Sequence, residues 1–137
     1  MIIDATDLIV GRFATVAAKK AILGEEIHIV NCEKAIITGN RAYLMADYKN
    51  KREQGNPVTG PFYHRSADKY VRRMIRGMMN HRSPRGKAAF ARLKCYVGVP
   101  AEFKDKKLET IKEANASKLP TLKYMRIGEI CKLLGAR

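Results

Sequence analysis

The order of apolar segments in the N-terminal part of the chain constrains the fold most. Residues 1–5 are short and apolar, and residues 27–32 alternate and are rich in β-branched side chains, so both predict strands. Between them, apolar residues recur at helical spacing over 11–24. A second helix is predicted over 41–53, with Asn40 as its cap. Alternating strands and helices predict an α/β fold with parallel strands and helices on the sheet faces.

The remaining elements are predicted from turn residues and periodicity. Two glycines and two prolines in 55–61 predict a loop, and the irregular region continues to Asp68. Asp68 is the expected cap of the next helix, which should end at residues 80–81. A strand is expected in 35–39, where it extends or neighbours the second strand. A helix over 84–94, capped by Ser83, should precede a strand over 95–100. The chain should then continue as a charged surface extension over 101–120 and a short helix that Gly135 stops.

Composition fits one globular domain that favours a polyanionic partner. The chain has 137 residues, 46% of them apolar, which suffices for a core. Its net charge is +14, and the segment 69–94 holds nine Lys or Arg and no Asp or Glu. Such an excess favours nucleic acid or an anionic membrane surface. Without an apolar run of about 18 residues or a signal peptide, we expect a cytoplasmic protein with no membrane partner.

The helix after Asp68 is predicted to carry a cationic face opposite an apolar face. Neighbouring cations on one helix face lie ~5–6 Å apart, close to the phosphate spacing of one nucleic-acid strand. A solvated helix face is the alternative, but such faces usually mix charges of both signs. The apolar set is Val71, Met74, Ile75 and Met78, and the cationic set is Lys69, Arg72, Arg73 and Arg76.

The loop before this helix combines aromatic rings with a cation. Phe62, Tyr63 and His64 are candidates for stacking on unpaired bases, while Arg65 takes a phosphate. The alternative is that Phe62 or Tyr63 anchors the loop to the core. Unpaired bases are a feature of RNA, so the pattern favours RNA over duplex DNA.

A second basic turn follows in "HRSPRGKAA". Because Ser83 and Pro84 open a helix, its free N–H groups predict an anion site beside Arg82, Arg85 and Lys87. Gly86 would let the backbone approach a phosphate. The start of the first helix at Arg12 is a further candidate phosphate contact.

Catalysis and cofactor binding are poorly supported by the sequence. The segment 1–17 has one glycine where the dinucleotide fingerprint needs three. His28 is predicted to be structural, whereas His64 and His81 lie in the basic region and are expected to touch RNA. The acids Asp4, Asp7 and Glu33 fall near strand ends but also suit capping or surface roles. Cys32, Cys95 and Cys131 lack metal-ligand spacing and predict core thiols, so no metal or cofactor is expected.

Several motifs together resemble the universal L13 family of large-subunit ribosomal proteins, in its archaeal-type branch. They are "IDATDLIVGRFATVAAK", "IVNCEKAIITGN" and "GPFYHRSADKYVRRMIRGMMNHRSPRGKAAFARLKCYVGVP". The resemblance implies a three-layer α/β/α arrangement around a small, mainly parallel four-stranded sheet, and binding to ribosomal RNA. The family's RNA-facing cations map onto Arg72, Arg73, Arg76, Arg82, Arg85 and Lys87, with the loop around His64 and Arg65. Where many members have proline, this chain has Asn80, which tolerates a left-handed turn.

We therefore expect a structural large-subunit ribosomal protein, not an enzyme, whose partners are ribosomal RNA and neighbouring ribosomal proteins, without a small-molecule substrate. An RNA-modifying enzyme and a DNA-packaging protein are the alternatives. The expected parts are an α/β scaffold over 1–54, a basic RNA-binding loop and helices over 55–94, and an extension with a terminal helix over 101–137. The predicted RNA-binding residues are Tyr63, His64, Arg65, Lys69, Arg72, Arg73, Arg76, His81, Arg82, Arg85, Lys87, Arg92, Lys94 and Arg12.

Overall fold

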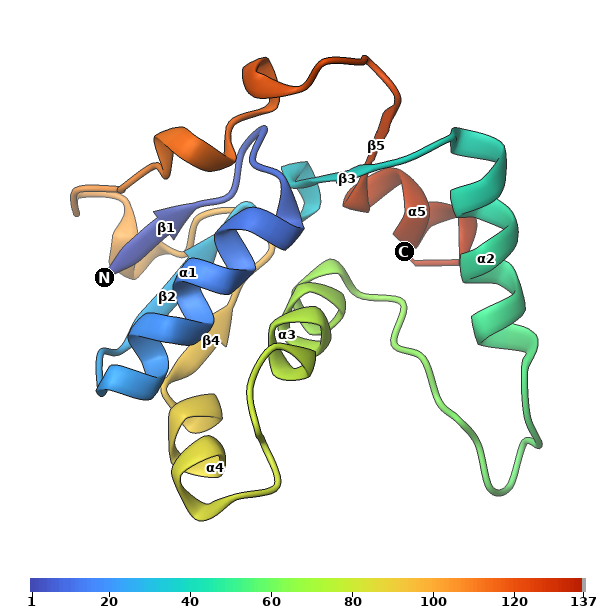
Figure 1. Ribbon diagram of the computed structural model, residues 1–137, viewed down its shortest axis with the longest axis horizontal. Helices are drawn as coiled ribbons and strands as arrows, with labels where there is room; N and C mark the ends of the chain where they lie inside the picture. The colour runs from blue at the N-terminus through green and yellow to red at the C-terminus, as the bar shows by residue number, and fades with distance from the viewer. Residues whose placement is uncertain (137) are drawn as a thin grey trace.

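A parallel three-stranded sheet lies at the centre of the structure, a computed structural model that describes residues 1–136 (Figure 1). β1 (Ile2–Asp4), β2 (Ile27–Val30) and β4 (Leu93–Cys95) pair in the order β1-β2-β4. The predicted α/β class and the first two strands are confirmed. β4 begins at Leu93, which sequence periodicity had assigned to a helix, because this leucine continues the buried row of the sheet.

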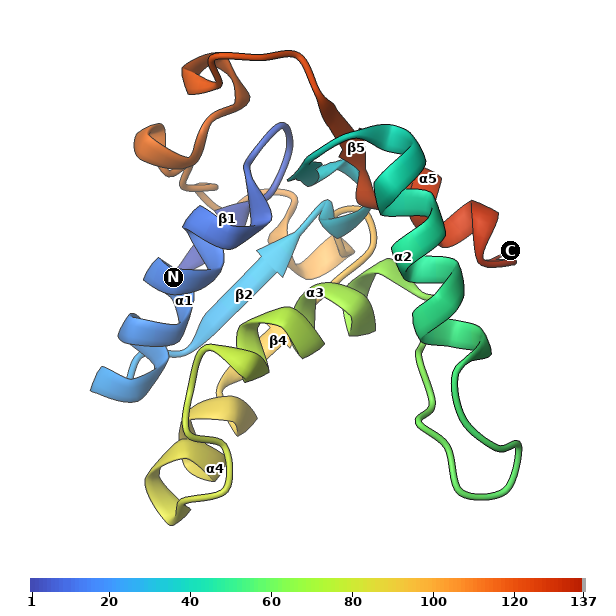
Figure 2. The same cartoon turned by 45° about the vertical axis from the view of Figure 1, so that its right-hand side comes forward.

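Side chains on one face of this sheet form the centre of the core. The register places Ile3 beside Ile29 and Ile27 beside Leu93, and all four are fully buried. Burial of one such side chain contributes about 1.5–3 kcal/mol relative to exposure, so this row accounts for a large part of the stability. The helices α1 and α3 cover this face (Figures 1 and 2).

The first helix, α1 (Val10–Leu23), packs closely because its inner face is built of small residues. Ala14, Ala17 and Ala21 are fully buried around Phe13. Alanine costs no side-chain entropy in a helix and lets neighbouring backbones approach. Gly24 ends the helix with φ of 109°, a left-handed conformation that glycine adopts cheaply, as predicted.

The segment 35–39 does form a strand, but it does not join the parallel sheet. β3 (Ile36–Thr38) pairs antiparallel with β5 (Tyr124–Arg126), a strand that the sequence did not predict. The expected four-stranded sheet is therefore a three-stranded sheet and a separate two-stranded one. A strand of three residues is too short to show a clear alternating pattern in the sequence. Pairing between segments as far apart in the chain as β3 and β5 depends on the tertiary fold.

Two helices flank the small sheet on the side away from β1. α2 (Arg41–Glu53) begins where predicted, and the Asn40 side chain accepts a hydrogen bond from the Ala42 N–H. α5 (Ile127–Leu133) follows β5 directly, and Gly135 has φ of 85° just after it. The loop after α2 projects away from the body of the protein (Figure 2).

The C-terminal extension covers the outer edge and the far face of the parallel sheet. Glu109 forms an isolated bridge with Ile3 at the free edge of β1, with backbone hydrogen bonds to Ile2 and Asp4. Phe103 is buried, and its ring centroid lies 4.9 Å from that of His28. The extension therefore takes the place of a fourth strand. Its short 3-10 turns are Ala101–Phe103, Lys112–Ala114 and Ala116–Lys118, and a further one, Cys32–Lys34, follows β2.

The basic region forms two shorter helices than predicted. α3 (Ala67–Gly77) starts two residues earlier, with Ser66 as its N-cap, so Asp68 lies in the first turn and not at the cap. α4 (Pro84–Ala91) begins as predicted but ends before β4. On α3, Val71 and Ile75 are fully buried as expected, whereas Met78 is 43% exposed because the helix has already ended.

Within residues 1–136, no helix combines the length and apolarity needed to cross a membrane.

Candidate nucleic-acid interface

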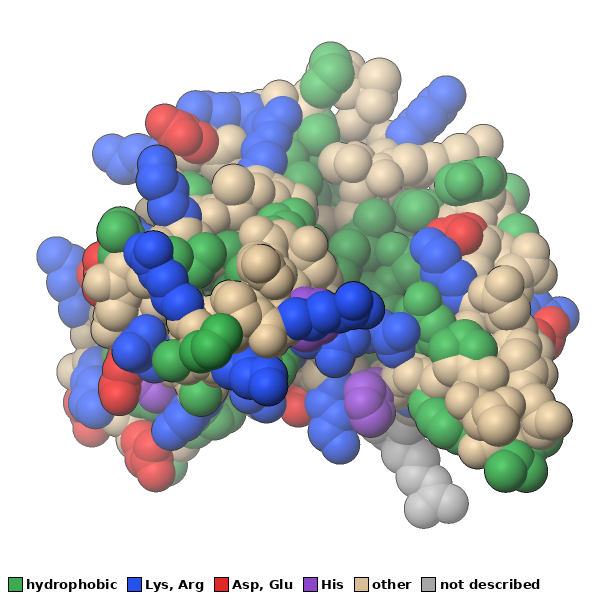
Figure 3. Space-filling view, turned by 60° about the horizontal axis from the view of Figure 1, so that its bottom comes forward, with side chains coloured by type: hydrophobic (Ala, Val, Ile, Leu, Met, Phe, Trp, Pro, Cys, Tyr) green, Lys and Arg blue, Asp and Glu red, His purple; other side chains and the backbone are tan. Residues whose placement is uncertain are grey.

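The four cations of α3 lie together along one side of a groove. They line a cavity of about 550 Å³ whose other walls are Phe62 and His64 from the preceding loop and Phe90 from α4. Lysine and arginine side chains gather across the middle of this face, with histidine among them (Figure 3). The predicted stripe and the predicted aromatic loop are thus brought together. The cations of this groove are Lys69, Arg72, Arg73 and Arg76.

Arg72 and Arg73 are held in place by aromatic rings. The Arg72 guanidinium carbon lies 4.4 Å from the centroid of the Phe90 ring, and Nη2 donates to the Phe90 carbonyl at 3.4 Å. The Arg73 guanidinium carbon lies 3.7 Å from the Tyr63 ring centroid, and Nη1 donates to the Phe62 carbonyl at 2.8 Å. Such cation–ring contacts are worth ~0.5–2 kcal/mol. Both guanidinium groups are therefore oriented before any ligand arrives.

One polar atom in this groove has no protein partner. Arg72 Nε is buried, and it makes no hydrogen bond within residues 1–136. Leaving such a donor unpaired costs about 1–3 kcal/mol, so this position of the Arg72 side chain lowers the stability of the free protein.

The loop from α2 to α3 is attached at its ends and exposed at its tip. Gly60 and Asn56 exchange two backbone hydrogen bonds, and Val58 between them is exposed. Phe62 is 64% exposed, so it does not anchor the loop to the core, whereas Tyr63 is half-buried under Arg73. The two rings have separate roles, one in holding a cation and the other open for stacking.

The turn before α4 is closed by hydrogen bonds around the predicted cap, Ser83. Ser83 Oγ accepts the Gly86 N–H at 3.1 Å and donates to the Asn80 carbonyl, while Lys87 N–H donates to the Ser83 carbonyl. The cap therefore occupies the Gly86 N–H, whereas the Lys87 bond is the first regular hydrogen bond of the helix. A Cβ on Gly86 would lie 1.8 Å from the Asn80 carbonyl oxygen, so the glycine is required by this turn. Asn80 does not take the left-handed conformation that its sequence suggested.

The cations of this turn and of α4 project into solvent. Arg82, Arg85 and Lys87 are exposed, and none forms a hydrogen bond or ion pair through its side chain within the described chain. His81 is half-buried beside them. This group neighbours the α3 groove but lacks the ring contacts that fix Arg72 and Arg73.

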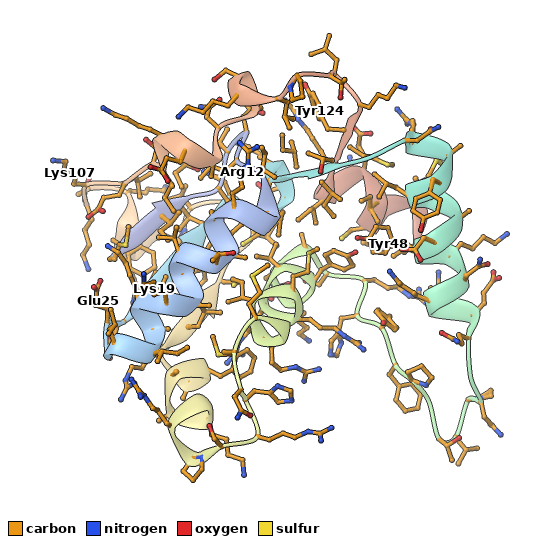
Figure 4. All side chains as sticks on the ribbon, viewed as in Figure 1. Arg12, Lys19, Glu25, Tyr48, Lys107 and Tyr124 are labelled. Carbon is orange, nitrogen blue, oxygen red and sulfur yellow. The ribbon has the colours of Figure 1, made fainter. Side chains whose placement is uncertain are left out.

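Three predicted contact residues lie apart from the α3 groove. Arg12, at the start of α1, donates from Nη1 to the Glu113 carbonyl of the extension at 3.2 Å (Figure 4). Arg92 donates from Nη1 to the Ala21 carbonyl near the end of α1 at 3.4 Å. Lys94 pairs in register with His28, on the sheet face opposite Leu93. These three cations have structural neighbours elsewhere in the fold.

Phe90 is the groove residue that the sequence did not single out. It was predicted to point inward because of its helical spacing, and it is indeed half-buried. Its role under Arg72 joins two helices, so no local spacing in the sequence identifies it.

The acids near the strand ends have structural partners. Asp4 accepts hydrogen bonds from Thr6 and from Asn31 Nδ2, and Asp7 pairs with Arg126 at 3.2 Å. Burial opposes ionisation of Asp4, but the hydrogen bonds from Asn31 and Thr6 outweigh it and lower its pKa. Across residues 1–136, no group of three or more His, Cys, Asp or Glu residues is arranged to hold a metal ion.

The thiols and His28 are also structural. Cys32 and Cys131 are buried, Cys95 is partly buried, and all three are free thiols. Burial raises the pKa of Cys131 to about 11, and a hydrogen bond with Cys32 followed by burial raises the pKa of Cys95. Thiols with raised pKa values are poor nucleophiles. His28 stacks on Tyr96, consistent with its predicted structural role.

The fold and the site define a basic α/β protein whose cations gather in one groove. The family model described as Ribosomal protein L13 matches residues 1–102. Large ribosomal subunit protein uL13 of Methanosarcina barkeri is 43% identical over 137 residues, covering 99% of this chain and 98% of that protein. The proteins of the same name from Methanocaldococcus jannaschii and Methanococcoides burtonii are 40% and 38% identical, each covering 99% of this chain and 98% of its own length.

The chain belongs to the ribosomal protein L13 family. It is therefore a ribosomal protein and not an enzyme, and the predicted archaeal-type relationship is confirmed. The family model ends at residue 102, whereas the relatives align with the extension as well. The alternative of an RNA-modifying enzyme is excluded by this membership.

Proposed function

We propose that this protein is a structural constituent of the large ribosomal subunit that binds ribosomal RNA through the α3 groove. The observation that carries the proposal is the convergence of four cations and three exposed or half-buried rings on one groove of about 550 Å³. Phosphates repel one another where RNA segments converge, and fixed cations reduce that repulsion. Neighbouring ribosomal proteins complete the surroundings, and the protein resides on ribosomes in the cytoplasm.

The proposed RNA contacts fall into two groups, those in the α3 groove and those outside it. Phosphate contacts at the groove fix the position of the protein but carry little sequence information. Phe62 and His64 supply stacking surfaces for unpaired bases. We propose that the segment 55–94 acts as the binding part of one domain, with 1–54 as scaffold and 101–137 as extension. Marginal contacts in this proposal are Arg65, His81, Arg82, Arg85 and Lys87, and outlying ones are Arg12, Arg92 and Lys94.

Sedimentation tests membership in the large subunit. A native lysate is separated on a sucrose gradient at low and moderate salt, and fractions are probed for this chain. We expect co-migration with the large subunit at both salt concentrations. A peak at the top of the gradient at every salt concentration would contradict the proposal.

Salt dependence tests the binding mode. The affinity of the purified protein for large-subunit RNA should fall linearly on a log–log plot against salt, with roughly 0.7–0.9 units of slope per phosphate contact. A flat response would refute binding through phosphate neutralisation.

A further inference from the structure

A second cavity, of about 440 Å³, lies apart from the α3 groove and shares with the binding described above only the marginal contact Arg65. Its walls come from segments far apart in the chain that meet beyond the carboxyl ends of β2 and β4. Glu33 follows β2, Val97 follows β4, Ser66 precedes α3, and Gly128 and Cys131 belong to α5. Ligands of α/β proteins commonly bind outside the carboxyl ends of the strands. The volume is within the range of small-molecule sites, about 300–1,000 Å³.

The walls of this cavity are mainly apolar, with one acid. Ala67, Val97 and Cys131 contribute apolar surface. Glu33 is the single acid among the described residues that line it. The Gly98 N–H donates to Glu33 Oε2 at 3.1 Å, which holds the carboxylate in place, while Oε1 has no hydrogen-bond partner within residues 1–136. A largely apolar ligand with a hydrogen-bond donor on its edge matches this combination.

The rim of the cavity carries the opposite charge and leads toward the α3 groove. Arg65 and Lys132 are exposed cations on the rim, and Arg65 Nη1 lies 3.4 Å from the Gly135 carbonyl. Arg65 adjoins His64, which lines the α3 groove, so the two sites share one short loop segment. Cations outside and a carboxylate inside suit a nucleotide whose phosphate stays at the rim. A free phosphate would instead be repelled by Glu33.

We propose that this cavity takes one unpaired nucleobase of the bound RNA, with its amino-bearing edge donating to Glu33 and its phosphate at Arg65. Exocyclic amino groups of adenine, cytosine and guanine donate to carboxylates, whereas uracil has none. Insertion of a base turned out of its stack would give the protein a sequence-sensitive contact, which phosphate contacts do not supply. The inference rests on the proposed binding of ribosomal RNA.

Chemical probing of large subunits tests this site. Subunits carrying Val97→Trp, which fills the mouth of the cavity, or Glu33→Gln, which removes its carboxylate, are treated with dimethyl sulfate and kethoxal. The matched controls are Leu122→Trp and Glu102→Gln, both at exposed positions away from the cavity. We expect one unpaired adenine, cytosine or guanine to become several-fold more reactive with both cavity variants and with neither control.

The outcomes separate this inference from the RNA-binding proposal. Variants are first checked for folding by circular dichroism and for incorporation into the subunit. Identical reactivity patterns in all four variants would overturn the nucleobase site while leaving the groove proposal intact. The same result is expected if a side chain of a neighbouring protein, and not a nucleobase, occupies the cavity. Failure of the unmodified protein to bind RNA would remove both proposals.

Discussion

The two helices of the basic region carry similar charges but hold them differently. On α3, the Arg72 and Arg73 guanidinium groups pack on rings and donate to backbone carbonyls. On α4, Arg85 and Lys87 are exposed and have no such contacts within the described residues. The sequence contains one continuous basic segment. In the structure, the α3 cations form its ordered half, and the α4 cations form its unconstrained half.

The difference has a physical consequence for binding. An arginine side chain carries about 2 kcal/mol of rotamer entropy, part of which is lost when a ligand fixes it. On α3 the fold has already fixed the two guanidinium groups, so a phosphate gains more net free energy there. The α4 cations can instead adjust to RNA of varied shape. We infer that α3 sets the position of the RNA and that α4 adds general attraction.

The largest effect should come from reversing charge on the ordered half. Arg73→Glu with Arg76→Glu replaces two groove cations and should weaken RNA binding at least about a hundredfold, since each contact to a charged group is worth about 1.5–3 kcal/mol. Arg82→Glu with Arg85→Glu makes the same charge change outside the groove and should cost clearly less. Filter binding at fixed salt measures both, and equal losses would show that only net charge matters.

A glycine pair tests the turn that separates the two halves. Gly86→Ala places a Cβ against the Asn80 carbonyl and should lower the free energy of unfolding by about 1–3 kcal/mol. Gly77→Ala is the matched control, because its Cβ would meet nothing within 4 Å and alanine favours helix. Urea denaturation measures both. An unchanged Gly86→Ala protein would mean that the turn adjusts at no cost.

Removal of the Tyr63 ring should leave the Arg73 guanidinium without its aromatic contact. Tyr63→Leu removes the ring under Arg73 and should reduce RNA affinity about three- to tenfold, through a cation–ring contact of about 0.5–2 kcal/mol. Tyr43→Leu, on the exposed surface of α2, is the control and should bind normally. Affinity is measured by fluorescence anisotropy with labelled RNA. Equal binding by both variants would argue against preorganisation of Arg73.

The smallest effect concerns the far face of the sheet. Burial, followed by the positive charges of Lys94 and the N-terminus, lowers the pKa of His28 below its ordinary value of 6.5. Protonation of His28 therefore disfavours the folded state. The free energy of unfolding should be unaffected by His28 above pH 6.5 and should decrease as the pH falls from 6.5 to the folded-state pKa of His28. His28→Phe should flatten this decline, whereas His64→Gln should preserve it. Urea denaturation across this pH range measures the slope, and a slope retained in His28→Phe would assign it to other groups.

Part of the fold and of the interface was predictable because its signals are local. The end of α1 at Gly24 follows from the ability of glycine to adopt a left-handed conformation, and the start of α2 after Asn40 follows from side-chain capping. Both effects act within a few residues. The cationic face of α3 follows from helical spacing. By contrast, the role of Phe90 under Arg72 and the bond from Arg73 to Phe62 join separate segments, and spacing along the chain does not encode them.

The sequence by itself determined the α/β class, the excess of positive charge, the family and the cationic stripe. These depend on composition, on periodicity and on short motifs. Only the tertiary structure decided that β3 pairs with β5, that the extension replaces a fourth strand, and that Lys94 faces away from the groove. Each of these depends on which distant segments bury one another's apolar and backbone surfaces, a choice made by the free energy of the whole chain.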